Sequence, residues 1–180
     1  MTRAFLAFAL PDGVCRALTV QQFLLPLPRR VPPEDFHLTL CFLGDAVRDA
    51  VLQAVHDGLQ ALRLPALAIA LQGIGHFGGA RPRAVFAAVK PDPALDHLQA
   101  KLATCARRAG CTIPHARFVP HVTLGRFSRY PPDDMPRLER SIVAGAGFVA
   151  DPFRVDAVRL YASTLGDPPR YDEVAAYPLA

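Results

Sequence analysis

Short apolar runs alternate with stretches of helical periodicity along the whole chain. The runs have the length and apolar composition of buried strands, so each of them predicts a strand. They cover residues 4–10, 36–43, 66–74, 84–89, 120–127, 153–161 and 171–179. Between most of them, apolar residues recur every three or four positions, which predicts amphipathic helices. These helices carry Val14 and Leu18, then residues 47–62, then Leu95, Leu98 and Leu102, and finally Leu138, Ile142 and Val143.

Polar residues and glycines at the ends of these runs predict where the elements begin and end. Asp12 and Asp45 are placed to cap the helices that follow them. Gly44 and Asp45 are expected to close the preceding strand, and Gly110 to form the C-terminal cap of the helix before it. The glycine-rich segment 73–79 then divides the chain into two halves, each of which repeats strand, helix, strand, helix, strand.

Length and composition fit one folded domain. A chain of 180 residues with 51% hydrophobic and 20% charged residues can bury a core and is not disordered. We therefore expect a single domain over residues 1–180, and we expect it to be a monomer. The apolar runs are far shorter than the roughly 20 residues of a bilayer span, so no membrane segment is predicted.

Cysteine spacing and charge indicate the cellular compartment and the kind of partner. The cysteines form no C-x-x-C pair, which favours reduced thiols and a cytoplasmic location. They are Cys15, Cys41, Cys105 and Cys111. The net charge of +4 and the pI near 9.1 come mostly from arginine, whose planar fork suits bidentate phosphate contact. An anionic partner would not be repelled.

One tetrapeptide pattern occurs at the same place in both halves. The second strand of the first half contains His37-Leu38-Thr39-Leu40, and that of the second half contains His121-Val122-Thr123-Leu124. Residues i and i+2 of a strand point to the same side, so each motif presents an imidazole and a hydroxyl together. Two such strands across a cleft would surround a phosphate-sized volume. One imidazole could then accept a proton while the other donates one.

The alternative for each motif is a histidine that is only hydrogen-bonded to the neighbouring threonine. That interpretation suits a single His-x-Thr, whereas the repeated pair favours a catalytic site. The other histidines show no metal-ligand spacing and have no clustered carboxylates, so no metal is expected. They are His56, His76, His97 and His115.

The segments around both motifs resemble a known family. Residues 30–44 and 118–126 are similar to the two signature motifs of the LigT-type RNA 2′,3′-cyclic phosphodiesterases, within the 2H phosphoesterase superfamily. Residues 5–11 resemble the opening segment of the same family, and residues 160–163, Tyr171 and residues 177–179 resemble its closing segment, so the likeness covers essentially the whole chain. Cys41 and the absence of tryptophan are departures from the family pattern.

The resemblance implies a fold and a chemistry. The fold is α+β and bilobal, with two pseudo-symmetric lobes whose mostly antiparallel sheets face a central cleft and whose helices lie outside. No cofactor is implied. The partner is an RNA end or nucleotide that bears a 2′,3′-cyclic phosphate. The family pattern makes His37 the general acid and His121 the general base, with Thr39 and Thr123 hydrogen-bonded to the phosphate oxygens.

Two further positions follow from the resemblance. Arg126, five residues after His121, is assigned to the phosphate, with a solvated arginine at the end of the strand as the alternative. Simple alternation would aim Arg126 away from His121, so the strand must twist or bulge there. Phe42 is assigned to stacking on the terminal base, with core packing as the alternative. The turn arginines could track an RNA backbone or only solubilise their loops, and they are Arg29, Arg30, Arg81 and Arg83.

Several functions remain open at this point. The leading hypothesis is metal-independent hydrolysis of a 2′,3′-cyclic phosphate to a 2′-phosphate, with the reverse 2′,5′ joining of RNA as a close variant. Related sites act on small cyclic nucleotides or on 2′,5′-linked oligonucleotides. A non-catalytic RNA-binding module and a metal-dependent hydrolase are the alternatives from other classes.

Overall fold

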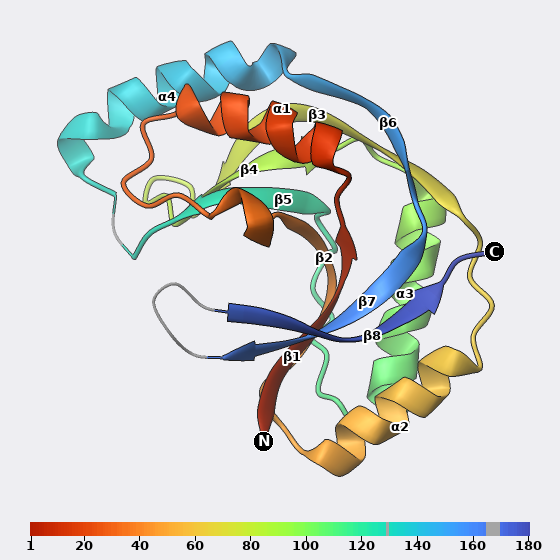
Figure 1. Ribbon diagram of the computed structural model, residues 1–180. Coiled ribbons are helices and arrows are strands. Elements are labelled where there is room, and N and C mark those ends of the chain that lie inside the picture. The colour runs from red at the N-terminus through yellow and green to blue at the C-terminus, as the bar shows by residue number, and fades with distance from the viewer. Residues whose placement is uncertain (129, 165–169) are drawn as a thin grey trace.

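The computed structural model describes residues 1–128, 130–164 and 170–180. Its strands form an eight-stranded sheet in the order β6-β3-β4-β5-β2-β1-β7-β8, in which neighbouring strands are antiparallel (Figure 1). The strands are β1 (Thr2–Ala9), β2 (His37–Val47), β3 (Leu67–Phe77), β4 (Ala84–Val89), β5 (His121–Arg126), β6 (Val149–Val155), β7 (Ala157–Thr164) and β8 (Arg170–Pro178). The α-helices are α1 (Asp12–Phe23), α2 (Asp49–Gln60), α3 (Pro93–Arg108) and α4 (Met135–Ala144). The α+β class and the antiparallel pairing are confirmed.

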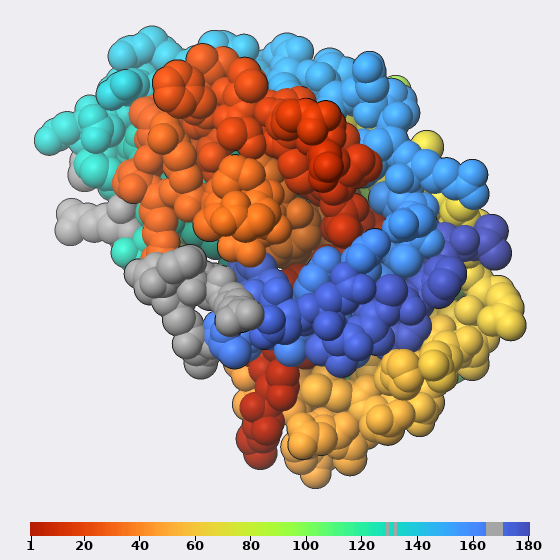
Figure 2. All heavy atoms as spheres, in the orientation of Figure 1, coloured from red at the N-terminus to blue at the C-terminus, as the bar shows by residue number. Residues whose placement is uncertain are grey.

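The sheet consists of two lobes that interleave along the chain. One lobe contains β2, β1, β7 and β8, with α2 and α3 packed against it, and the other contains β5, β4, β3 and β6, with α1 and α4 (Figure 1). The lobes therefore do not coincide with the two sequence halves, because the first helix of each half packs on the other half's histidine strand. Figure 2 shows the early chain, in red and orange, directly against the late chain, in blue.

The two lobes meet at the strands that carry the repeated motif. β2 and β5 are joined through the pair Leu38 and Val122, so the two expected sheets are continuous rather than separate. From this seam outward the order is symmetric, with β2 and β5 at the centre, then β1 and β4, then β7 and β3, and β8 and β6 at the edges. The pseudo-symmetry of the two lobes thus places both motifs at the centre of the sheet.

The predicted strand over residues 153–161 is two strands. β6 ends at Val155 and pairs with β3, whereas β7 begins at Ala157 and pairs with β1 in the other lobe. Val155 and Ala157 are both buried on either side of exposed Asp156. The two-residue period therefore continues through the point where the chain changes lobes, and alternation alone cannot detect the break.

Neither of the two aspartates expected to cap a helix does so. Asp12 is itself the first residue of α1, and the capping position is held by Pro11 without a side-chain hydrogen bond. Asp45 lies inside β2 and forms an ion pair with Arg3. The strand continues past Gly44, whose φ of 143° suits glycine, and α2 begins only at Asp49.

Helices lie where the four periodic segments predicted them, although Val143 of α4 is 75% exposed and does not belong to the buried face of that helix. Leu18 of α1, Leu59 of α2 and Leu98 of α3 are each no more than 2% exposed, so the apolar stripes face the sheet. Gly110, with a φ of 98°, follows the last turn of α3 as expected. Among the described residues, no helix is both long and apolar enough to span a bilayer.

Candidate active site

The two histidine motifs lie side by side on one face of the central strands. His37 and Thr39 are partly exposed, whereas Leu38 and Leu40 are buried, and β5 repeats this alternation. Because Leu38 pairs with Val122 in an antiparallel register, the next positions set His37 across from Thr123 and Thr39 across from His121. The structure therefore brings together the four residues predicted to surround the phosphate.

Each imidazole is held in the same tautomer by its own strand. Nδ1 of His37 lies 2.7 Å from the carbonyl oxygen of Asp35, and Nδ1 of His121 lies 2.7 Å from that of Val119. A carbonyl oxygen can only accept, so Nδ1 carries the hydrogen in both rings and donates it. Nε2 is left as the nitrogen that can exchange protons with a substrate.

Aromatic side chains surround both imidazoles. The ring of His37 lies 4.9 Å from Phe5 and 5.2 Å from Tyr171 between centroids. The ring of His121 lies 4.8 Å from Phe77 and 5.2 Å from Phe86. These contacts fix the ring planes and remove water from one side of each histidine.

This burial lowers the pKa of both imidazoles. The pKa of His37 is lowered to about 4, mainly by burial and to a smaller extent by the charges of Arg126 and His121, while the hydrogen bond to Asp35 partly offsets these effects. The pKa of His121 is lowered as well, first by burial and then by Arg126. Both rings are therefore neutral at pH 7 when no anion is bound, and both lie within electrostatic reach of Arg126.

A β-bulge turns Arg126 toward His121, as the sequence predicted. Val85 of β4 pairs with Gly125 and Phe86 with Thr123, which leaves Leu124 as an extra residue on β5. One extra residue reverses the alternation beyond it. Arg126 consequently lies on the same side of the strand as His121 and Thr123.

The lining of a hollow of about 340 Å³ confirms that Arg126 lies beside His121. Its lining includes His121, Thr123 and Arg126, together with Phe77 and two of the turn arginines, Arg29 and Arg83. An adjoining hollow of about 560 Å³ shares Arg83 and Ser128 with it and adds Arg81. Arg30 is directed elsewhere, with its guanidinium carbon 6.0 Å from the ring centre of Phe23.

Comparison with known proteins identifies the family. Residues 10–167 match the family described as the 2′-5′ RNA ligase superfamily. The chain belongs to this superfamily. The RNA 2′,3′-cyclic phosphodiesterase of Geobacillus stearothermophilus is 31% identical over 158 residues, which are 86% of this chain and 49% of that protein. The enzyme of the same name from Thermotoga maritima is 29% identical over 137 residues, or 75% of this chain and 70% of the relative.

Solved structures of E. coli LigT share the whole fold. The crystal structure of E. coli LigT complexed with 3′-AMP superposes with a TM-score of 0.79 at 25% sequence identity, covering 99% of this chain and 98% of LigT. The chain thus corresponds to nearly all of LigT, although it spans only about half of the Geobacillus protein.

Phe42 occupies the position in β2 that Arg126 occupies in β5. Leu6 pairs with Cys41 and Ala7 with Thr39, so Leu40 is an extra residue on β2, just as Leu124 is on β5. Phe42 pairs with Phe5, whose ring contacts His37, and therefore lies on the histidine face. With 39% of its surface exposed, Phe42 is not a core residue.

Sequence reasoning assigned no role to the aromatic residues around the two imidazoles. They are Phe5, Tyr161, Tyr171, Phe77 and Phe86. Aromatic residues in strands are usual, and only the strand order shows that these rings converge on the histidines, because it places β1, β7 and β8 on one side of β2 and places β4 and β3 on one side of β5. The signal available in the sequence was the position of Tyr161 and Tyr171 within segments that resemble the family.

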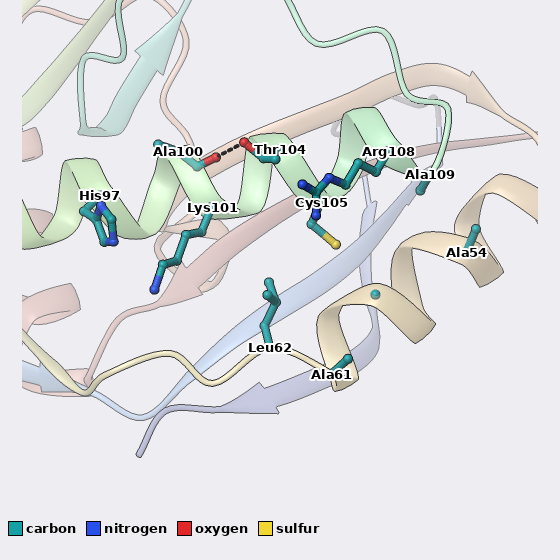
Figure 3. A pocket seen from close by; sticks show the side chains of 11 residues that line it. Ala54, Ala61, Leu62, His97, Ala100, Lys101, Thr104, Cys105, Arg108 and Ala109 are labelled. Carbon is teal, nitrogen blue, oxygen red and sulfur yellow. Dashed lines mark hydrogen bonds between the residues drawn. The ribbon is translucent and has the colours of Figure 1, made fainter.

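A separate groove lies on the helical side of the sheet and contains none of the predicted site residues. This hollow of about 690 Å³ lies between α2 and α3, where small and apolar residues are joined by His97, Lys101 and Arg108 (Figure 3). The two helices approach closely at Gly58, where the Cβ of any other residue would stand 2.7 Å from Sγ of Cys105. Among the described residues, no group of three or more His, Cys, Asp or Glu side chains could hold a metal ion.

Proposed function

We propose that this protein is an RNA 2′,3′-cyclic phosphodiesterase that opens a terminal cyclic phosphate to a 2′-phosphate. The observation that carries the proposal is the pair of imidazoles with fixed Nδ1 hydrogens, which present Nε2 beside Arg126 on one face of the sheet. Relatives named RNA 2′,3′-cyclic phosphodiesterase and the complex of E. coli LigT with 3′-AMP support this substrate class.

In the proposed reaction, a water molecule attacks the phosphorus and the bond from phosphorus to O3′ breaks. His121 accepts the water proton at Nε2, and His37 donates a proton from Nε2 to the departing O3′. Arg126 and the hydroxyls of Thr39 and Thr123 hold the non-bridging oxygens, where negative charge develops. These groups supply proton transfer and charge stabilisation without a metal ion.

The backbone hydrogen bonds have a defined role in this scheme. An imidazolium is stabilised when its Nδ1–H donates to a carbonyl oxygen, and the bond also keeps the ring from turning. The low pKa of His37 means that it can act as the acid only if the bound phosphate raises that pKa. The negative charge of the substrate acts in this direction, because it stabilises the imidazolium directly and also offsets the charge of Arg126.

The assignment of acid and base can be separated from the rest of the proposal. A substrate with a better leaving group in place of O3′ needs no proton for departure and should restore turnover to His37→Ala but not to His121→Ala. Selective rescue of His121→Ala would reverse the two roles while leaving the two-histidine reaction in place.

The path of the RNA strand is proposed from the arginines next to the site. Arg29 and Arg83 line the hollow beside His121, and Arg81 lines the adjoining one, so phosphates upstream of the terminus would pass along them. Phe42, on the histidine face of the other lobe, would stack on a base. The name of the superfamily supports 2′,5′ ligation as the reverse use of the same site.

We also propose a cytoplasmic monomer in which residues 1–180 act as one bilobal domain. Unpaired Cys15, Cys41, Cys105 and Cys111 are consistent with a reducing compartment. The continuous sheet supports a single folded unit, since both lobes contribute a strand to its centre.

The test is to incubate the protein, in the presence of a chelator, with an oligonucleotide ending in a 2′,3′-cyclic phosphate. The expected product ends in a 2′-phosphate. A 3′-phosphate product, or turnover that returns only with a divalent ion, would overturn the proposal. Turnover restricted to cyclic mononucleotides or to 2′,5′-linked oligonucleotides would move the protein to another activity of the same chemistry. Binding without turnover would make it an RNA-binding module.

A further inference from the structure

Gln22 is a buried polar side chain whose hydrogen bonds reach the active-site strand. It lies on α1, is only 4% exposed, and donates from Nε2 to the carbonyl oxygens of Leu124 at 2.7 Å and Val31 at 2.8 Å. The N–H of Val31 donates to the same Leu124 oxygen at 2.9 Å. Gln22 therefore joins a helix, the segment leading to His37, and β5.

The Leu124 carbonyl belongs to the residue that makes the β-bulge. Leu124 has no partner on β4, and its carbonyl oxygen accepts instead from Gln22 and from Val31, next to the antiparallel bridge between Arg30 and Gly125. The neighbouring Gly125 is pressed against the same segment, since a Cβ there would stand 2.8 Å from the carbonyl oxygen of Arg29. The bulge is thus clamped between α1 and residues 29–31.

The other lobe contains a weaker form of the same arrangement. Gln99 of α3 donates from Nε2 to the carbonyl oxygen of Leu40 at 3.3 Å, and Leu40 is the extra residue of β2. In each lobe, a glutamine from the helix behind the sheet therefore contacts the bulged leucine that lies two positions before a cleft-facing residue. These residues are Arg126 in β5 and Phe42 in β2.

We propose that Gln22 is a positioning residue for Arg126, acting by holding the Leu124 bulge. The inference rests on the proposed function only in that Arg126 is taken to bind the phosphate. A buried glutamine that merely stabilised α1 would affect activity and Arg126 independently. A positioning residue acts through Arg126, so its effect must disappear when Arg126 is absent.

The experiment is a double-mutant cycle with two readouts, on wild type, Gln22→Met, Arg126→Ala and the double variant. The first readout is the pKa of His121, measured by NMR titration. The charge of Arg126 lowers that pKa, so Gln22→Met should raise it when Arg126 is present and leave it unchanged in the Arg126→Ala background. The second is kcat/KM for the cyclic phosphate, which Gln22→Met should lower about tenfold only when Arg126 is present.

Gln99→Met is the matched control, because it removes the equivalent glutamine from the other lobe. Gln99→Met should change kcat/KM by the same factor with and without Arg126. If Gln22→Met does not fold, Gln22→Asn takes its place, since the shorter amide keeps its donors but cannot span both carbonyls.

Equal changes in both backgrounds, or no change in the His121 pKa for a folded Gln22 variant, would overturn the inference. A protein without activity on cyclic phosphates that still showed the NMR coupling would refute the proposed function and leave the positioning role standing.

Discussion

Replacing His37 with glutamine should make the folded protein less sensitive to acid. Burial holds the pKa of His37 at about 4 in the folded state, whereas an unfolded histidine titrates near 6.5. The folded state therefore binds fewer protons than the unfolded state between these values, and stability falls as the pH drops through 6.5. The linkage relation gives a loss of about 2 kcal/mol between pH 8 and pH 5 for this one group.

The assay is urea unfolding of wild type and His37→Gln at pH 8 and pH 5. Other groups titrate in both proteins, so the quantity of interest is the difference between the two losses, which should be about 2 kcal/mol in favour of the variant. His115→Gln, at an exposed histidine, is the control and should lose as much stability as wild type. Equal losses in wild type and His37→Gln would refute the buried, neutral state of His37.

Other predictions concern the substrate contacts. Arg126→Lys should lower kcat/KM at least about tenfold, because an ammonium cannot reproduce a bidentate contact, but it should keep the pH optimum. Arg126→Gln should move the optimum of kcat/KM to higher pH, because Arg126 lowers the pKa of both histidines, and an unchanged profile would place Arg126 away from them. Phe42→Ala should weaken oligonucleotide binding by about 1 to 3 kcal/mol with little change in Tm, whereas a lower Tm at unchanged affinity would indicate a packing role. Replacing Arg81, which lines the adjoining hollow, with glutamine should reduce the salt dependence of oligonucleotide binding and leave turnover of a cyclic mononucleotide unchanged, and equal losses for both substrates would contradict the proposed strand path.

The sequence predicted the chemistry of the site more fully than it predicted the arrangement of the lobes. Alternation along a strand is a local property, so the His-x-Thr spacing alone predicted which side chains share a face. The bulge before Arg126 could also be inferred once the family resemblance had assigned Arg126 to the phosphate, because an odd spacing from His121 is incompatible with a regular strand and a shared site. Both inferences needed only one strand at a time.

Strand partners depend on residues far apart in the sequence, and here local patterns were insufficient. β6 and β7 read as one strand because Val155 and Ala157 continue the period across the crossover between lobes. Asp45 looked like a helix cap, but Arg3 on the neighbouring strand provides an ion-pair partner and the strand continues through it. Gln22 could not be distinguished from a surface residue of an amphipathic helix until its contacts with β5 were known.

The central claim is that two imidazoles act together, as acid and base, without a metal ion. The most direct test is the rate of opening of a 2′,3′-cyclic phosphate oligonucleotide, in chelator, by wild type, His37→Ala, His121→Ala and the double variant. Each single variant should remain folded and lose on the order of 10² to 10⁴ in rate. The double variant should be little slower than either single one, because the two groups serve one step. Turnover near the wild-type rate in either folded single variant would contradict the account.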